Sequence, residues 1–318
     1  MTQHKPDHGG GMDAAMAQYG GARDNWLDLS TGINPTPYPI PDIPPHYWQV
    51  LPDDAAMARL LAAARRFWNV PDGAQIVPAS GVSTLIAMLP NLAAQSQISI
   101  LNPTYNEYAG AFQGAGWAIQ DKAPVQVRVH PNNPDGRVFT RAEIAASHDH
   151  LTIIDESFCD VCPENSLIAL AQSPDHIVLK GMGKFWGLAG LRLGFAIAAP
   201  DLAHKITQQL GPWSISGPAQ FIGQKALADM GWAIETRARL HAMAGELRDV
   251  LVQSGLAPLG GTDLFQLAET TDAKALQAHL CRNHILTRIF PYSQKWIRLG
   301  LPENADALGR LRDALRGF

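Results

Sequence analysis

A lysine in a glycine-rich loop is the side chain of this sequence best suited to covalent chemistry. Lys184 lies in the loop 180–194, directly after the apolar run 176–179. The apolar run predicts a buried strand, and the glycines after it predict a loop that presents the lysine amine. A lysine in a surface turn is ordinarily only solvated, so its partners in the sequence decide how the loop is interpreted.

Two more polar side chains follow predicted strands upstream of this loop. Asp155 ends the apolar run 151–154, and Asn133 lies in a turn rich in Asn, Pro and Gly after the alternating run 125–129. In an open α/β sheet, ligands bind outside the carboxyl ends of the strands. We therefore expect Asn133, Asp155 and Lys184 to face one crevice.

These three groups together fit one cofactor, pyridoxal 5'-phosphate. An amine such as that of Lys184 holds the cofactor aldehyde as a Schiff base, and an acid such as Asp155 keeps the ring nitrogen protonated. An amide such as that of Asn133 can donate to the ring hydroxyl. Because the protonated ring accepts electrons from the substrate Cα, Asp155 is predicted to take part in the chemistry.

The sequence resembles the fold-type I pyridoxal-phosphate enzymes of the class I/II aminotransferase superfamily. The matching motifs run from His8-Gly9-Gly10 to the segment 296–300, and they include Asn34-Pro35, the segment 155–158 and the run 183–194. Within the superfamily, the chain is most similar to the branch that holds histidinol-phosphate aminotransferase and the threonine-phosphate decarboxylases of cobalamin biosynthesis.

The resemblance implies a role for each matching residue. Lys184 forms the Schiff base, Asp155 pairs with the ring nitrogen and Asn133 bonds the ring hydroxyl. The other implied cofactor contacts are Tyr105, which stacks on the ring, and Arg192 with the turn Gly81, Val82 and Ser83, which bind the phosphate. Residues 82–92 also read as a helix, and helix N-termini favour phosphate. The implied substrate contacts are Arg298, which grips the carboxylate, together with His8 and Asn34.

The sequence also departs from the family pattern. Phe158 stands where many members have a tyrosine, and the decarboxylases share this phenylalanine. Gly181 and Gly183 replace residues that often carry a hydroxyl, so two phosphate donors are missing. Leu51 replaces a tyrosine that relatives lend to the neighbouring subunit. Cofactor phosphate binding should therefore depend on Arg192, on backbone N–H groups and on Ser83.

The function implied by the resemblance is the decarboxylation of O-phospho-L-threonine to (R)-1-aminopropan-2-yl phosphate, a unit of cobalamin. An alternative is an aminotransferase that acts on histidinol phosphate or a related amino acid. A third possibility, from another class, is an idle partner protein that keeps the fold. The intact Lys184 and Asp155 argue against that third possibility.

Alternating strand-like and helical stretches predict an α/β fold. We expect a large domain with a mostly parallel sheet and helices on both faces, and a smaller α+β C-terminal domain. The expected parts are an extended N-terminal arm (1–44), a large domain (45–210) and a small domain (211–318). The predicted strands of the large domain are 75–77, 97–101, 125–129, 151–154, 176–179 and 194–198, and 53–68 is a predicted helix of this domain. A predicted helical segment, 218–254, leads into the small domain. The small domain should contain strands 264–267, 285–289 and 296–299 and helices 272–283 and 304–316.

The arm has too little apolar periodicity to fold alone, so its ordering needs packing on another surface. Relatives resemble one another in building their site at a two-fold interface. We therefore expect a homodimer with a shared active site.

Composition is typical of a compact soluble protein. The chain has 318 residues, 46% of them hydrophobic and 17% charged, with a net charge of −4. This charge gives no reason to expect a nucleic-acid partner. No apolar run is long enough to span a membrane and the first residues do not read as a signal peptide, so a cytoplasmic location is expected.

The cysteines could suggest a metal or redox site. The spacing of Cys159 and Cys162 suits half a zinc site or a redox pair, but no second pair exists, so reduced thiols and no metal are expected. Other side chains are expected to serve only the surface or the packing: His148 and His150 in an exposed turn, and Tyr108 and Trp186 in the core.

Overall fold

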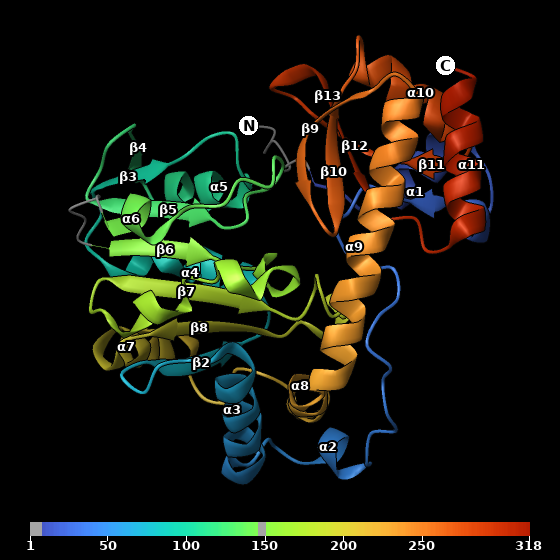
Figure 1. Ribbon diagram of the computed structural model, residues 1–318. Helices are drawn as coiled ribbons and strands as arrows, with labels where there is room; N and C mark the ends of the chain where they lie inside the picture. The colour runs from blue at the N-terminus through green and yellow to red at the C-terminus, as the bar shows by residue number, and fades with distance from the viewer. Residues whose placement is uncertain (1–7, 146–150) are drawn as a thin grey trace. The chain divides into compact units, whose positions relative to one another are not determined.

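The computed structural model describes residues 8–145 and 151–318, so the turn predicted at His148 and His150 lies outside the described residues. The chain divides into two compact units (Figure 1). The larger unit comprises residues 37–133 and 138–234, and the smaller unit comprises residues 1–36, 134–137 and 235–318. The compact units do not follow the predicted boundaries at 44 and 210, since the segment 211–234 lies in the larger unit. The predicted division into an arm and two domains stays a prediction.

The larger unit is built on a seven-stranded sheet in the order β2-β8-β7-β6-β5-β3-β4. The strands are β2 (Gln75–Ala79), β3 (Gln97–Ile100), β4 (Ala118–Ile119), β5 (Val125–Val129), β6 (Leu151–Asp155), β7 (His176–Gly181) and β8 (Gly194–Ala198). Neighbours from β4 to β7 run parallel, whereas β8 runs antiparallel to both β7 and β2. The sheet is therefore mostly parallel, as the sequence predicts.

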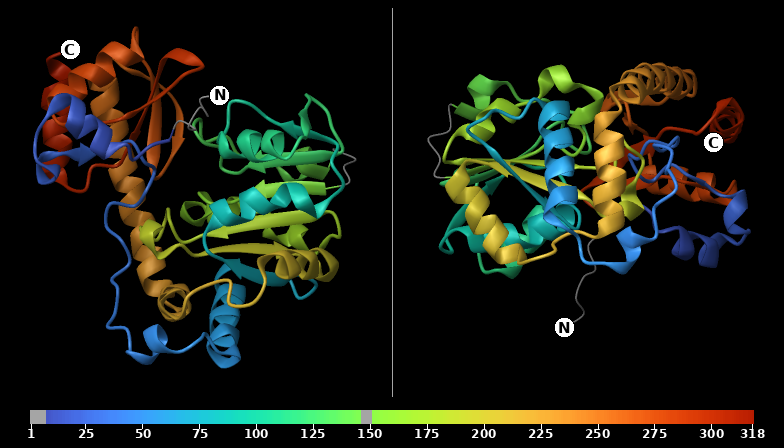
Figure 2. Two further views of the ribbon diagram at one scale, coloured as in Figure 1. Left: turned by 180° about the vertical axis from the view of Figure 1, so that it is seen from behind. Right: turned by 90° about the horizontal axis from the view of Figure 1, so that it is seen from below.

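Helical segments lie on both faces of this sheet (Figure 2). The α-helices that begin in the larger unit are α2 (His46–Gln49), α3 (Asp54–Trp68), α4 (Val82–Met88), α5 (Glu107–Gly114), α6 (Arg141–Ala145), α7 (Pro200–Leu210), α8 (Gly217–Ala228) and α9 (Met230–Gln253), and α9 continues into the smaller unit. β6 and β8 are buried along their whole length, as expected for strands covered on both faces.

Local signals set some of the helix ends. Asp53 caps α3, since its carboxylate accepts a hydrogen bond from the Ala56 N–H at 2.6 Å. The helix predicted over 82–92 is α-helical only to Met88 and ends as a 3-10 turn, η2 (Leu89–Leu92), at whose start Pro90 lies. A proline lacks the N–H that an α-helix needs beyond its first turn, which accounts for the change.

The smaller unit contains a four-stranded antiparallel sheet, ordered β12-β13-β10-β9, and a two-stranded parallel sheet, β1-β11. The strands are β1 (Leu27–Asp28), β9 (Ala257–Thr262), β10 (Phe265–Glu269), β11 (Ile285–Leu286), β12 (Arg288–Phe290) and β13 (Ser293–Gly300). Its helices are α1 (Met12–Tyr19), α10 (Ala273–Arg282), α11 (Ala305–Arg316) and the second part of α9. The predicted strand 285–289 is in fact two strands that belong to different sheets.

The prediction of an extended arm is wrong over part of its length. Residues 12–19 form α1, and Leu27 and Asp28 pair with β11. Met12 and Ala15 of α1 are buried in one cluster with Trp26, Cys281 and Leu286. Tertiary packing therefore supports this helix, although its own sequence carries no side-chain cap. Among the described residues, no helix combines the length and apolar character needed to cross a membrane.

Candidate active site

The topology of the larger unit brings the ends of several strands to one edge of the sheet. β3, β5, β6 and β7 run parallel, and β2 runs in the same direction because both β2 and β7 are antiparallel to β8. Their carboxyl ends therefore share an edge with the beginning of β8. Ligands of open α/β sheets bind at such an edge.

A cavity of about 140 Å³ lies among the loops that follow these strands. Every cofactor contact predicted from the sequence lines it: Gly81, Val82, Ser83, Tyr105, Asn133, Asp155, Lys184 and Arg192. Its wall also includes Ser157, Phe158 and the two glycines of the lysine loop, Gly181 and Gly183. The structure thus brings together residues that are far apart in the sequence, in the segments that follow or precede the strands.

Backbone hydrogen bonds fix the loop that carries Lys184. The Met182 N–H donates to the Leu193 carbonyl at 3.0 Å, and the Gly187 N–H donates to the Lys184 carbonyl at 3.1 Å. The Lys184 Nζ lies 5.4 Å from the centre of the Phe158 ring. The amine is therefore held at the cavity wall by a defined loop and against an aromatic face.

Asp155 is buried at the end of β6, and protein groups bond both of its carboxylate oxygens. The Ser157 N–H donates to Oδ1 at 2.9 Å, and the Tyr108 hydroxyl donates to Oδ2 at 2.8 Å. Burial raises the pKa of Asp155, while the hydrogen bonds from Ser157 and Tyr108 and the charge of Lys184 act to lower it. Tyr108 packs in the core as predicted, but its hydrogen bond to Asp155 was missed.

The two asparagines after β5 have different surroundings. The Asn132 amide donates to the Pro103 carbonyl at 2.9 Å and accepts from the Thr104 hydroxyl at 2.6 Å, whereas Asn133 lines the cavity. Asn132 therefore anchors the loop that presents Tyr105. Burial, with Glu107 and Asp155 nearby, raises the pKa of Tyr105 to about 12, so its phenol is neutral at physiological pH.

The turn before α4 depends on the small size of glycine. Gly81 has a φ of +90°, and a Cβ at this position would lie 2.7 Å from the Arg192 guanidinium. Gly194 lies equally close to the turn, since a Cβ there would meet the Val82 nitrogen at 2.6 Å. Arg192 itself has a φ of +51°, which is uncommon outside glycine and is often found at functional sites. The guanidinium therefore lies beside the backbone of the Gly81 turn.

A buried ionic cluster lies behind the lysine loop. The Lys180 amine is 2.6 Å from Glu156 Oε2 and 3.5 Å from Asp160 Oδ1. Burial would lower the pKa of Lys180, but Glu156 and Asp160 outweigh it and raise the pKa above its ordinary value. The Trp186 indole donates to Asp160 at 3.1 Å, so this cluster also anchors the segment that follows Lys184.

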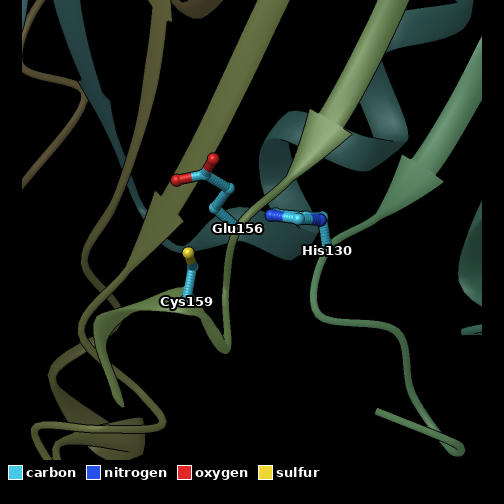
Figure 3. Close-up of side chains that lie close together, drawn as sticks. All are labelled: His130, Glu156 and Cys159. Atoms are coloured by element: carbon cyan, nitrogen blue, oxygen red, sulfur yellow. The ribbon is translucent and has the colours of Figure 1, made fainter. Parts of the chain in front are cut away.

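His130, Glu156 and Cys159 point toward one another in the same region (Figure 3). One potential ligand atom from each lies within 4.8 Å of the others. The Phe139 N–H donates to His130 Nδ1, so Nε2 carries the proton that it donates to the Asn165 carbonyl at 2.7 Å. The Glu156 carboxylate also accepts from the Leu167 N–H at 2.5 Å. Because these atoms already bond the protein, we assign the group to the fold.

The predicted substrate contacts belong to the smaller unit. His8 lines a hollow of about 330 Å³ together with Ser30 and Arg288. The Gly10 N–H donates to Ser30 Oγ at 2.7 Å, and the Ser30 carbonyl accepts a hydrogen bond from Arg298 Nη2 at 2.8 Å. A Cβ on Gly9 would lie 2.3 Å from that carbonyl, so the His-Gly-Gly motif needs its glycine to approach Ser30.

Arg298 and Arg288 lie opposite each other on paired strands. They are register partners of β13 and β12, so their side chains leave the same face of the sheet. Burial, and the charge of Arg288, lower the pKa of Arg298 to about 10, which leaves its guanidinium charged at neutral pH. Two neighbouring cations attract an anionic ligand. Sequence reasoning missed Arg288, because only the hairpin register places it beside Arg298.

Asn34 has a different environment from the other predicted substrate contacts. Its side chain is buried, and Oδ1 accepts a hydrogen bond from the Thr36 N–H at 2.9 Å. This is a local turn contact of the kind that asparagine commonly makes. The proposed contact with substrate stays a prediction.

Comparisons with known proteins agree with this geometry. The family model for aminotransferase class I and II matches residues 122–315. The threonine-phosphate decarboxylase of Sinorhizobium sp. is 40% identical over 97% of this chain and 97% of its own length. The threonine-phosphate decarboxylase of Pseudomonas aeruginosa is 38% identical over 98% of each. The chain therefore belongs to the aminotransferase class I and II family.

A solved structure supports the fold. Histidinol-phosphate aminotransferase from Sinorhizobium meliloti, in complex with pyridoxal-5'-phosphate, matches with a TM-score of 0.85 over 100% of this chain and 97% of that chain, at 19% sequence identity. These findings confirm the family resemblance and the fold class predicted from the sequence.

Proposed function

We propose that this protein is a pyridoxal 5'-phosphate-dependent lyase that decarboxylates O-phospho-L-threonine to (R)-1-aminopropan-2-yl phosphate, for cobalamin biosynthesis. The main support is the near full-length similarity to two threonine-phosphate decarboxylases, at 40% and 38% identity. An aminotransferase reaction on histidinol phosphate or a related amino acid is the second candidate, favoured by the same family membership. A cytoplasmic location stays a prediction from the sequence.

The cavity of the larger unit fits the cofactor through its set of donor groups. Lys184 offers the amine, Asp155 a buried carboxylate and Asn133 an amide, and Arg192 adds a cation beside the Gly81 turn. When bound, the cofactor supplies a ring that accepts the electrons released at the substrate Cα. In this proposal Asp155 holds a proton on the ring nitrogen, Tyr105 stacks on the ring, and Arg192 with Ser83 binds the phosphate.

The substrate carries two anionic groups, and the smaller unit offers a pair of neighbouring arginines, Arg288 and Arg298. We assign the carboxylate to Arg298, which Ser30 holds in place, and the substrate phosphate to Arg288 with His8. Arg298 would hold the carboxylate that leaves as carbon dioxide, and the Lys184 amine would return a proton to Cα.

One assay separates the candidate functions. The purified protein loaded with cofactor is incubated with O-phospho-L-threonine, with and without a keto-acid acceptor. Release of carbon dioxide without the acceptor supports the lyase. Turnover of phosphothreonine or histidinol phosphate only with the acceptor would identify an aminotransferase, and no turnover of any amine would favour the idle partner.

Replacing Arg288 tests the phosphate assignment. Arg288→Gln should lower kcat/KM for O-phospho-L-threonine by about 10- to 100-fold, because a charge-assisted contact is lost. The rate with unphosphorylated threonine should change less than about twofold. The matched control is Arg282→Gln, an exposed arginine at the end of α10 in the same unit. Equal losses with both substrates would contradict the assignment.

We also propose a homodimer, on the basis of an exposed apolar segment in the larger unit. Ile40, Trp48, Val50 and Leu51 are between 58% and 67% exposed. Tyr47 of the same segment packs on Phe221, with ring centres 4.8 Å apart, so the segment is anchored while its neighbours face outward. An anchored apolar surface of this kind is typical of an interface, and two-fold dimers are the commonest soluble assembly.

Charge introduced on this segment should separate the dimer. We expect Trp48→Asp to raise the dimer dissociation constant by at least about 30-fold, because interface tryptophans often dominate binding. Analytical ultracentrifugation over a concentration series measures the constant. The control is Val252→Asp, at a comparably exposed residue of α9 in the smaller unit. A parent protein that is monomeric and fully active at assay concentration would refute the dimer.

A further inference from the structure

A buried tyrosine hydroxyl forms a hydrogen bond to the carboxylate that the proposed reaction depends on. Tyr108 lies in the first turns of α5 and is fully buried, and its hydroxyl donates to Asp155 Oδ2 at 2.8 Å. Phe112, one turn further along the same helix, is buried in the same core cluster without a hydroxyl. Core packing alone would therefore accept phenylalanine at this position, and the hydroxyl needs a separate explanation.

The hydrogen bond acts against the effect of burial on Asp155. Burial disfavours an ionised carboxylate, and a donor bonded to the charged form stabilises it. The Ser157 backbone N–H donates to Oδ1 and the Tyr108 hydroxyl donates to Oδ2, and the Ser157 side chain also acts to lower the pKa of Asp155. Two other ionisable groups interact with this carboxylate. The charge of Lys184 acts to lower the pKa of Asp155, and the charge of Asp155 acts to raise the pKa of Tyr105. Tyr108→Phe removes the donor on Oδ2 and keeps the aromatic ring that fills the core.

We propose that Tyr108 is a positioning residue that keeps Asp155 ionised and aimed into the cofactor cavity. Its role toward the cofactor rests on the proposed function, whereas its effect on Asp155 itself does not. A carboxylate that loses a donor becomes more basic. The proton shared with a ring nitrogen then moves toward the carboxylate, and the ring becomes a weaker electron acceptor.

The first test is Tyr108→Phe in the protein without cofactor. The Asp155 carboxyl carbon is observed by 13C NMR over a pH titration and assigned with Asp155→Asn. We expect the Asp155 pKa to rise by about one unit in Tyr108→Phe, the size of one lost hydrogen bond to a charged group. The control is Ser99→Ala, which deletes another buried hydroxyl of the same unit, one that donates to the Asp121 carbonyl at 3.0 Å. An unchanged Asp155 pKa in Tyr108→Phe would overturn the proposal, whatever reaction the protein catalyses.

The second test follows the cofactor by absorbance and needs no turnover. Tyr108→Phe should weaken pyridoxal 5'-phosphate binding by about 10-fold and shift the absorbance of the bound cofactor, whereas Ser99→Ala should change the affinity less than about twofold. In the Asp155→Asn variant, adding Tyr108→Phe should change the affinity less than about twofold, because Tyr108 is proposed to affect the cofactor only through the Asp155 carboxylate. Equal effects in both backgrounds would mean that Tyr108 serves only the packing. A parent protein that binds no cofactor would refute the proposed function and the cofactor role of Tyr108 together, and the NMR result would stand by itself.

Discussion

Lys184→Ala should abolish covalent attachment of the cofactor and lower the decarboxylation rate by at least about 1,000-fold. The substitution removes both the amine that binds the cofactor aldehyde and the group that returns a proton to the substrate, and positioned proton transfer alone contributes about 100- to 10,000-fold. The fold should persist, because Lys184 lies in a loop that backbone hydrogen bonds hold. Borohydride reduction followed by mass spectrometry measures the covalent adduct.

Two other lysines serve as controls for this experiment. Lys180 is the nearest alternative in the sequence, but its amine is buried and paired with Glu156 at 2.6 Å. Lys180→Ala should therefore destabilise the protein by about 3–5 kcal/mol, the usual effect of breaking a buried ion pair, and leave the adduct in the folded fraction. Lys205→Ala, an exposed change on α7, should alter neither property. An adduct that persists in Lys184→Ala would identify another attachment site.

Asp155→Asn should retain the cofactor but lower kcat by at least about 100-fold. Asparagine has nearly the same shape, and its single carbonyl oxygen can still accept from the Ser157 N–H while its NH2 group donates to the Tyr108 oxygen, but a neutral amide cannot hold a proton on the ring nitrogen. Removing one preorganised electrostatic group from an active site typically costs about 100- to 1,000-fold. Cofactor content is measured by absorbance and kcat by carbon dioxide release. Asp121→Asn, an exposed change, serves as the control. Turnover close to that of the parent in Asp155→Asn would exclude Asp155 as the partner of the ring nitrogen.

Much of the candidate cofactor site could be predicted because it is built from strand ends. Asn133, Asp155 and Lys184 each follow an apolar run that forms a strand, and parallel strands bring their carboxyl ends to one edge of the sheet. The family resemblance supplied the remaining cavity residues, such as Tyr105 and Arg192. Roles that depend on the order of motifs along the chain can therefore be predicted from the sequence.

The arm shows where sequence reasoning failed. Residues 12–19 lack a helix cap and lie in the segment for which the sequence predicts an extended arm, yet they form α1. Burial of Met12 and Ala15 against Cys281 and Leu286 supports this helix. Its partners come from the other end of the chain, so no local pattern could reveal them.

The sequence by itself determined the order of the strands along the chain, the polar residues at their ends and, through its motifs, the family. Only the tertiary structure decided that the Tyr108 hydroxyl bonds Asp155 and that Arg288 lies opposite Arg298. The physical reason is distance along the chain. Strand and helix periodicity depend on near neighbours, whereas a buried hydrogen bond or a strand register depends on which distant side chains fill the same space.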